Sequence, residues 1–404
     1  MKRYHLIFIT LIFIFTSAAW WLLGATLGYR TSTIGTRGRG AVMELWGPNL
    51  IQHHPLARLA EDREHQTLLP TQSSVQVALD YQPRKRGLIW HRTYGVAFQA
   101  EYVFKNPTAV THAMELDFPL PGHEVRLEQF QFDLLVDGKP LPNTAERVPG
   151  EDVMRARVEL SPGQAVTLKT AYEARGMDFW SYEFAPGSRI RDFELRLHTN
   201  FAEVDFPLNT GSPTTPLQPL EGGQWELGWR YEDVIAARGV GMIMPAEVNV
   251  GAVATRVCLF APLSLGLFFG VLLLAGVVKK AELHPMNYLL LAAGFFAFPL
   301  LFAYSVDVLP VVAAFAVASA ASMLLVGGYL RWVAGGKLFW IALPTQFFYL
   351  VLFSASFFLT GFTGLTLTVG GVVTLALLMA GTAQVNWAEV NWLGSWRARE
   401  VAAS

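Results

Sequence analysis

Long stretches without a charged residue or a histidine dominate the last third of the chain, and one more lies near the N-terminus. They are Leu6–Gly28, Val257–Val278, Tyr288–Val306, Pro310–Leu330, Leu338–Thr360 and Gly364–Ala383. About 20 apolar residues are enough for a helix to cross the hydrocarbon core of a bilayer. The pattern predicts six transmembrane helices: an N-terminal anchor over residues 1–28 and a five-helix block over residues 257–383, followed by a tail over residues 384–404.

Residues 29–256 have a different pattern, in which apolar and polar positions alternate with period two. Alternation over Val96–Phe104 and Phe130–Val136 indicates strands, and Asp137-Gly138 after the second strand is a strong hairpin signal. A second hairpin is expected where Ser161–Gln164 separates the alternating runs Arg155–Leu160 and Ala165–Tyr172. Short strands separated by turns predict a mainly antiparallel, all-β, sandwich-like domain. Its core should include Phe98, Tyr102, Phe132 and Leu134.

Two features of this domain are predicted less directly. Two Phe-Pro-Leu runs, at residues 118–120 and 206–208, suggest two sandwich-like halves with a break near Gly176. Glycines 35, 38, 40 and 47 with Pro48 are expected to interrupt regular structure after the first helix, and Leu56–Leu68 to form a short helix.

Basic residues in the short connections set the orientation. Eight of them flank the predicted helices: Lys2, Arg3, Lys279, Lys280, Arg331, Lys337, Arg397 and Arg399. Because basic residues in short loops stay cytoplasmic, we expect both termini inside and residues 29–256 outside, in the periplasm. A cleaved signal peptide is the alternative for the first segment, but its apolar run exceeds the usual 7–15 residues, which favours a retained anchor.

Composition limits the partners and crosslinks that the protein can have. Residues 29–256 hold 23 Lys and Arg against 28 Asp and Glu, a net charge of −5. No basic patch stands out, which argues against a nucleic acid partner, whereas membrane lipid is an expected one. Cys258 is the only cysteine, so the domain cannot form a disulfide within the chain.

A search for reaction chemistry finds no catalytic motif, and no cofactor is predicted. The best metal candidate is His53-His54 with Glu61, Asp62 and His65, yet adjacent histidines in a loop are more often solvated polar residues, and no metal site is predicted. The apolar stretches of the helical block contain no charged residue or histidine within the membrane, unlike most ion-coupled transporters. Pro344-Thr345-Gln346 could mark a kinked binding element, or a bent packing helix whose Gln346 bonds a neighbouring carbonyl.

One segment resembles a known family. Leu283-His284-Pro285-Met286-Asn287-Tyr288-Leu289-Leu290 is similar to the Leu-His-Pro-Met-x-Tyr-Leu-Leu signature of CreD-type inner membrane proteins. Weaker similarities are Leu45-x-Gly47-Pro48 after the first helix, Gly327–Leu330 and Asn386-Trp387. The resemblance implies an inner membrane protein tied to cell-envelope integrity and stress tolerance. His284, Pro285 and Met286 are candidate binding residues, in a cytoplasmic turn that faces lipid headgroups or a protein partner.

Two classes of function follow. The first is a non-enzymatic envelope protein whose β domain binds or braces an unidentified envelope component. The second is a permease or lipid-handling protein that uses the helical block around Gln346. A cavity lined by Gln346, Thr345 and Tyr304 would favour transport, and a tightly filled bundle would favour anchoring.

Overall fold

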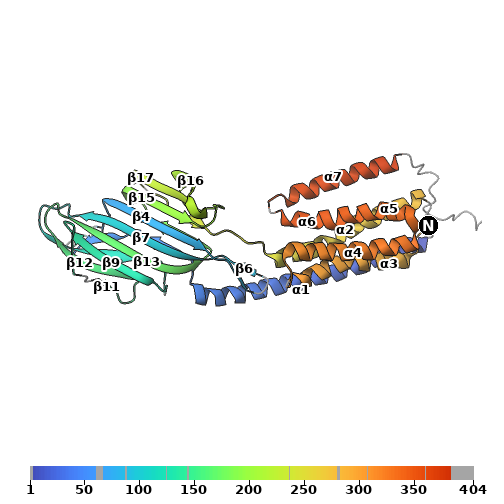
Figure 1. Cartoon of the computed structure of the whole chain (residues 1–404), viewed down its shortest axis with the longest axis horizontal. Coiled ribbons are helices and arrows are strands. Elements are labelled where there is room, and N and C mark those ends of the chain that lie inside the picture. The colour runs from blue at the N-terminus through green and yellow to red at the C-terminus, as the bar shows by residue number, and fades with distance from the viewer. Residues whose placement is uncertain are drawn as a thin grey trace, which may run out of the picture. The chain divides into compact units, whose positions relative to one another are not determined.

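The computed structural model describes residues 3–60, 67–86, 89–123, 125–142, 145–235, 237–279, 283–306, 308–359 and 361–383. The described residues form two compact units. The helical unit draws on Met1–Gly35, Gly87–Ile89 and Val248–Ser404, and the β unit on Thr36–Arg86 and Trp90–Glu247. Figure 1 shows the helices and the sheets that make up each of them.

The helical unit contains the first part of α1 (Arg3–Trp46), then α2 (Val250–Lys279), α3 (Pro285–Ser305), α4 (Val311–Val333), α5 (Gly335–Gln346), α6 (Phe353–Ala355) and α7 (Thr363–Thr382). A π-helix, η2 (Phe347–Leu352), joins α5 to α6, and a 3₁₀ turn, η3 (Ser356–Phe358), follows α6. Within the described residues, six helices are long and apolar enough to cross a membrane, counting Leu338–Phe358 as one. The buried core of this unit is rich in phenylalanine, including Phe268, Phe295, Phe298 and Phe302.

The β unit is built from eighteen strands over the described part of the chain, from two to thirteen residues long. They are β1 (Leu50–His53), β2 (Leu56–Leu59), β3 (Thr67–Leu68), β4 (Gln72–Tyr81), β5 (Arg84–Arg86), β6 (Ile89–His91), β7 (Thr93–Lys105), β8 (His112–Pro119), β9 (Glu128–Val136), β10 (Lys139–Pro140), β11 (Glu146–Arg147), β12 (Val153–Leu160), β13 (Ala165–Met177), β14 (Phe179–Glu183), β15 (Arg189–Thr199), β16 (Thr215–Pro219), β17 (Trp225–Ile235) and β18 (Val240–Ile243). A 3₁₀ turn, η1 (Glu221–Gly223), lies between β16 and β17.

The strands assemble into an eight-stranded sheet of order β10-β9-β13-β7-β4-β15-β17-β16 and a five-stranded sheet of order β11-β12-β8-β2-β3. A three-stranded sheet, β1-β14-β18, and the β5-β6 pair complete the set. Inward side chains of both large sheets join one hydrophobic core, where Phe98 of β7 lies 6.4 Å from Phe118 of β8 between ring centroids. The four predicted core residues Phe98, Tyr102, Phe132 and Leu134 are all buried, which confirms the period-two interpretation.

The predicted break near Gly176 is wrong, because strands from both sides of that residue share the eight-stranded sheet. Strand β13, which contains Gly176, pairs with β7, and β15 lies in the same sheet beside β4. The β15–β4 and β1–β14 pairs are parallel, so the eight-stranded and three-stranded sheets are mixed, whereas the five-stranded sheet is antiparallel. The two Phe-Pro-Leu runs therefore do not mark a duplicated half.

The second predicted hairpin is also wrong, although its turn exists. Gly163 has a φ of +72°, as a tight turn requires. The strands on either side do not pair with each other: β12 pairs with β8 and β13 pairs with β7 and β9. The turn instead passes the chain from one large sheet to the other, which alternation along each strand cannot reveal.

Helix α1 extends far beyond the predicted end at Gly28. It runs through Gly35, Gly38 and Gly40 to Trp46, because a glycine inside a helix costs only about 1 kcal/mol relative to alanine and does not end it. The helix ends at Gly47, whose φ of +85° gives the left-handed cap and whose amide bonds the Met43 carbonyl at 2.8 Å. Leu56–Leu59 is strand β2 rather than part of a helix, paired with β8.

Candidate functional site

The Leu-His-Pro-Met segment begins helix α3. His284 is the N-cap, and its Nδ1 accepts a hydrogen bond from the Met286 amide at 3.3 Å. Pro285 occupies the first turn, where its missing N–H costs nothing. The His284 ring also meets the ring of His5 edge-on, with centroids 5.7 Å apart. Met286 is exposed and Leu283 is buried, so the motif caps a helix and leaves one side chain free for contact.

Gln346, the fourth candidate binding residue, is the last residue of α5. It is fully buried, and its Nε2 donates to Ser322 Oγ of α4 at 3.2 Å. Ser322 Oγ in turn donates to the Gly294 carbonyl of α3 at 2.8 Å. Thr345 bonds the Ile341 carbonyl of its own helix at 2.7 Å, and Tyr304 is exposed. Among the described residues, Gln346 therefore joins three helices.

A π-helix begins one residue after Gln346. Pro344 lies inside α5 and removes one backbone donor two residues earlier. The Tyr349 carbonyl within the π-helix accepts a hydrogen bond from Ser264 of α2. The irregular backbone is thus stabilised by a side chain from a neighbouring helix.

The histidine pair considered as a metal candidate is split between core and surface. His54 Nδ1 is 2.7 Å from Tyr182 Oη, and Tyr182 Oη is 3.0 Å from Tyr102 Oη. His53 is half exposed, with its Nδ1 3.9 Å from Glu183 Oε2. Glu61, Asp62 and His65 lie outside the described residues. Among those that are described, no three His, Cys, Asp or Glu side chains are grouped as a metal site would require.

Burial determines the charge state of the polar groups in this core. Desolvation lowers the pKa of His54 to about 3, and His54 is ringed by Tyr102, Tyr182, Phe184 and Phe193. Burial also raises the pKa of Tyr102 and Tyr182. All three groups are therefore neutral near pH 7, and they form a hydrogen-bonded chain inside the β unit.

A large open groove of about 910 Å³ lies in the β unit where α1 ends against the eight-stranded sheet. Its lining comes from the end of α1, from β4, β7, β9 and β13, and from the loop before β9: Met43–Pro48, Ala78, Asp80, Gly95–Ala97, His123, Arg126, Glu128 and Glu173–Arg175. Trp46 lies at this end, with the Arg84 and Arg175 guanidiniums 5.1 and 5.4 Å from its ring centroid. Two cation–π contacts hold the indole in place.

A second, shallower depression of about 320 Å³ lies further along the same sheet face. It is lined by outward side chains of four adjacent strands, β4, β7, β13 and β9: Ser74, Gln76, Gln99, Glu101, Gln131, Asp133, Lys169 and Ala171. The groove and the depression share these four strands, and we call them together the polar trough. Sequence reasoning missed it because its residues are scattered from β4 to β13 along the chain and meet only through strand pairing.

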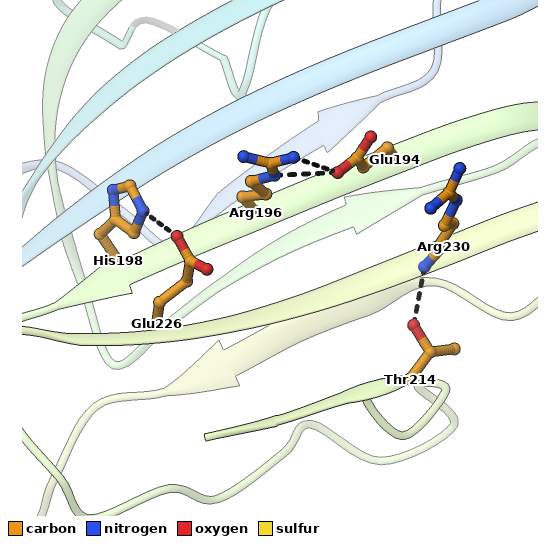
Figure 2. Close-up of polar contacts among 6 residues, drawn as sticks. All are labelled: Glu194, Arg196, His198, Thr214, Glu226 and Arg230. Atoms are coloured by element: carbon orange, nitrogen blue, oxygen red, sulfur yellow. Dashed lines mark hydrogen bonds and ion pairs between the residues drawn. The ribbon is translucent and has the colours of Figure 1, made fainter. Parts of the chain in front are cut away.

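Charged side chains around the trough pair with one another. Lys169 Nζ is 2.5 Å from Glu101 Oε1 across β13 and β7. Figure 2 shows two more pairs on β15 and β17: Arg196 with Glu194 at 2.8 Å, and His198 Nε2 with Glu226 Oε2 at 2.7 Å. The same view shows the backbone amide of Arg230 donating to Thr214 at 2.9 Å. Other charges of the trough lining, among them Asp80, Glu173 and Asp133, are acidic, so the lining carries more carboxylates than basic side chains.

Comparisons with known proteins bear on the helical unit most directly. A search of curated proteins found no match. Among solved structures, the chain is similar to a crystal structure of a Legionella pneumophila protein described as a candidate nutrient-binding protein. That match is 12% identical, covers 52% of this chain and 74% of the other, and has a TM-score of 0.32, too low to carry an argument. The family described as "Inner membrane protein CreD" matches residues 224–388, which confirms the resemblance and marks this part of the chain as similar to the CreD inner membrane protein family.

Proposed function

We propose that the protein is a non-enzymatic inner membrane protein whose β unit lies outside the cytoplasm and binds or braces a component of the cell envelope. The observation that carries this proposal is the polar trough, a groove of about 910 Å³ with an adjoining depression on the face of a broad sheet. Ligands bind in concave sites where placed polar groups fix their orientation, and the trough offers such groups on a concave surface. The family match supports the inner membrane location.

The proposed topology has six membrane crossings and both termini in the cytoplasm. It is supported by the eight basic residues of the chain ends and short connections, which then all lie inside. In this arrangement residues 29–256 are periplasmic, and the two large sheets form a β-sandwich around the shared core. The tail, residues 384–404, lies outside the described residues and is proposed to be cytoplasmic.

Anchoring is a better account of the helical unit than transport. The polar side chains that would line a permeation site do not converge: Gln346 bonds Ser322 in the bundle interior, whereas Tyr304 is exposed. Interhelical hydrogen bonds of this kind hold membrane helices together. Among the described residues, the permease alternative keeps one observation: the buried Gln346 Oε1 has no hydrogen-bond partner there.

The proposal is tested by blocking the trough in cells that lack the chromosomal copy. Ala97 is an exposed floor residue of the trough, and Ala97→Trp would fill it without removing a core contact. We expect the variant to be inserted at normal levels but to restore tolerance to envelope stress poorly. The matched control is Arg157→Trp, which places the same indole on an exposed position of β12, in the other large sheet. Equal rescue by Ala97→Trp and Arg157→Trp would contradict a binding role for the trough.

A further inference from the structure

Resting on the proposed function, we propose that the polar trough binds a neutral glycan strand of the cell wall. The first observation is a row of amide side chains across the sheet. Gln76 of β4 lies opposite Gln99 of β7, Gln99 lies opposite Ala171 of β13, and Ala171 lies opposite Gln131 of β9. With strands about 4.8 Å apart, this row is ~14 Å long.

The amides of this row have unused hydrogen-bonding capacity. Gln76, Gln99 and Gln131 are exposed, and their side chains make no hydrogen bond to any other residue that the structure describes. Each carries two donors and an acceptor, a set that matches the hydroxyl and acetamido groups of a cell-wall sugar. Two charged pairs beside the row, Lys169 with Glu101 and Arg196 with Glu194, are occupied with one another.

Small side chains on the floor of the trough allow a ligand to approach the backbone of the sheet closely. Ala78 and Ala97 lie opposite each other on β4 and β7, and Ala171 interrupts the amide row on β13. Small side chains there leave the backbone surface open between taller amides and ion pairs. A flat, extended polymer fits such a floor better than a bulky globular partner.

Other occupants fit less well. A protein partner would need aromatic or aliphatic anchor residues; the trough has exposed Met43 and Leu45 only at its α1 end, and the amide row offers polar and small side chains. A peptide that adds to the sheet would need a free strand edge, whereas the trough lies on the face of four strands in mid-sheet. An anionic polymer would need a net positive surface, and the groove lining contains Glu44, Asp80, Glu128 and Glu173 beside its two arginines.

The test uses the full chain in lipid nanodiscs and purified, protein-free peptidoglycan sacculi as the probe. Protein that sediments with the sacculi is measured, with and without soluble muramidase fragments as competitor. We expect binding by the wild type, at least fivefold loss in the triple variant Gln76→Ala, Gln99→Ala, Gln131→Ala, and a similar loss in Ala97→Trp. Gln224→Ala, which removes an exposed amide outside the trough lining, should bind as the wild type does.

The outcomes separate this inference from the proposed function. Sedimentation of all variants equal to that of the wild type, or no wild-type binding, overturns the glycan assignment. A photo-crosslinking residue in place of Gln99 is the second measurement: in cells it should label glycan-linked material. If it labels a single envelope protein instead, the glycan inference is wrong while a binding trough remains. Thermal unfolding of each variant confirms that it is folded.

Discussion

Single residues in the β unit show how burial sets chemistry. His54 would carry part of a positive charge near pH 6.5 in an unfolded chain, but in the core the polar contact that the structure gives it is with Tyr182. Charging it there would place a cation among aromatic rings without an acidic partner, so the fold holds the imidazole neutral. The sequence pattern of adjacent histidines could not distinguish this core position from a metal ligand, because only the fold shows which of the two points inward.

This neutral histidine makes the β unit sensitive to acid. Because the pKa of His54 falls from 6.5 to about 3 on folding, only the unfolded chain gains the proton between those values. Stability is therefore full above pH 6.5 and falls as the pH drops toward 3, by up to about 1.4 kcal/mol per pH unit from this group. Thermal unfolding of the full chain at pH 7.5 and pH 5.0 should show a larger loss for the wild type than for His54→Gln. Equal losses in both proteins would contradict a neutral, buried His54.

Asp117 illustrates a buried charge that does have partners. Its carboxylate accepts two hydrogen bonds from Arg155, at 2.5 and 2.8 Å, and lies 3.6 Å from Arg58. These contacts tie β8 to β12 and β2 in the five-stranded sheet. Arg155→Ala would leave most of a buried carboxylate uncompensated, at a cost of ~2–4 kcal/mol in unfolding free energy. Arg155→Lys should lose less, since the charge remains, and chemical denaturation of both variants measures the difference.

At the scale of elements, the sequence predicts where the membrane helices lie better than it predicts where α1 ends. The helices of the block were predictable because charge-free runs of this length leave few alternatives. The continuation of α1 to Trp46 was not, because Gly35, Gly38 and Gly40 count as breakers in a sequence, although a helix tolerates them one at a time. The end at Gly47 depends on tertiary structure: a Cβ there would lie 2.7 Å from the Arg175 carbonyl.

Gly47 should therefore be far less replaceable than a turn glycine. Gly47→Ala combines a left-handed backbone with a clash, whereas Gly138 has a φ of +75° and open space around its Cβ position. We expect Gly138→Ala to cost ~1 kcal/mol and Gly47→Ala clearly more, because only the latter must also displace β13. Melting temperatures of the two variants test this comparison. A similar drop in melting temperature for both variants would mean that the close approach of Gly47 to β13 does not contribute to stability.

The cap of α3 separates a structural role of His284 from a binding role. His284→Ala removes the side-chain acceptor for the Met286 amide and should cost ~1 kcal/mol. His284→Asn restores a good N-cap without an imidazole. If the motif acts only as a cap, Asn restores both protein level and envelope-stress tolerance. If tolerance stays low while the Asn variant is abundant and inserted, His284 is a binding residue as the sequence predicts.

For the molecule as a whole, the division of the chain into a helical unit and a β unit was predictable from the sequence, and the trough was not. Charge-free runs and alternation are local signals that a single sequence carries. The trough depends on register, which sets Gln76 beside Gln99 and brings Gln131 into the same row through β13. Such pairings join residues that local patterns treat as unrelated, so the site appears only once the strands are ordered.

The most direct test of the account is which side of the membrane the trough faces. In a Cys258→Ala background, which removes the only native cysteine, single cysteines are placed at Gln99 in the trough and at Met286 beside the α3 cap. Cells with a permeabilised outer membrane are treated with a membrane-impermeant maleimide. We predict that Gln99→Cys is labelled from outside and that Met286→Cys is labelled only after the inner membrane is opened. Labelling of Met286→Cys in intact inner membranes, or protection of Gln99→Cys until they are opened, would contradict a periplasmic envelope-binding role.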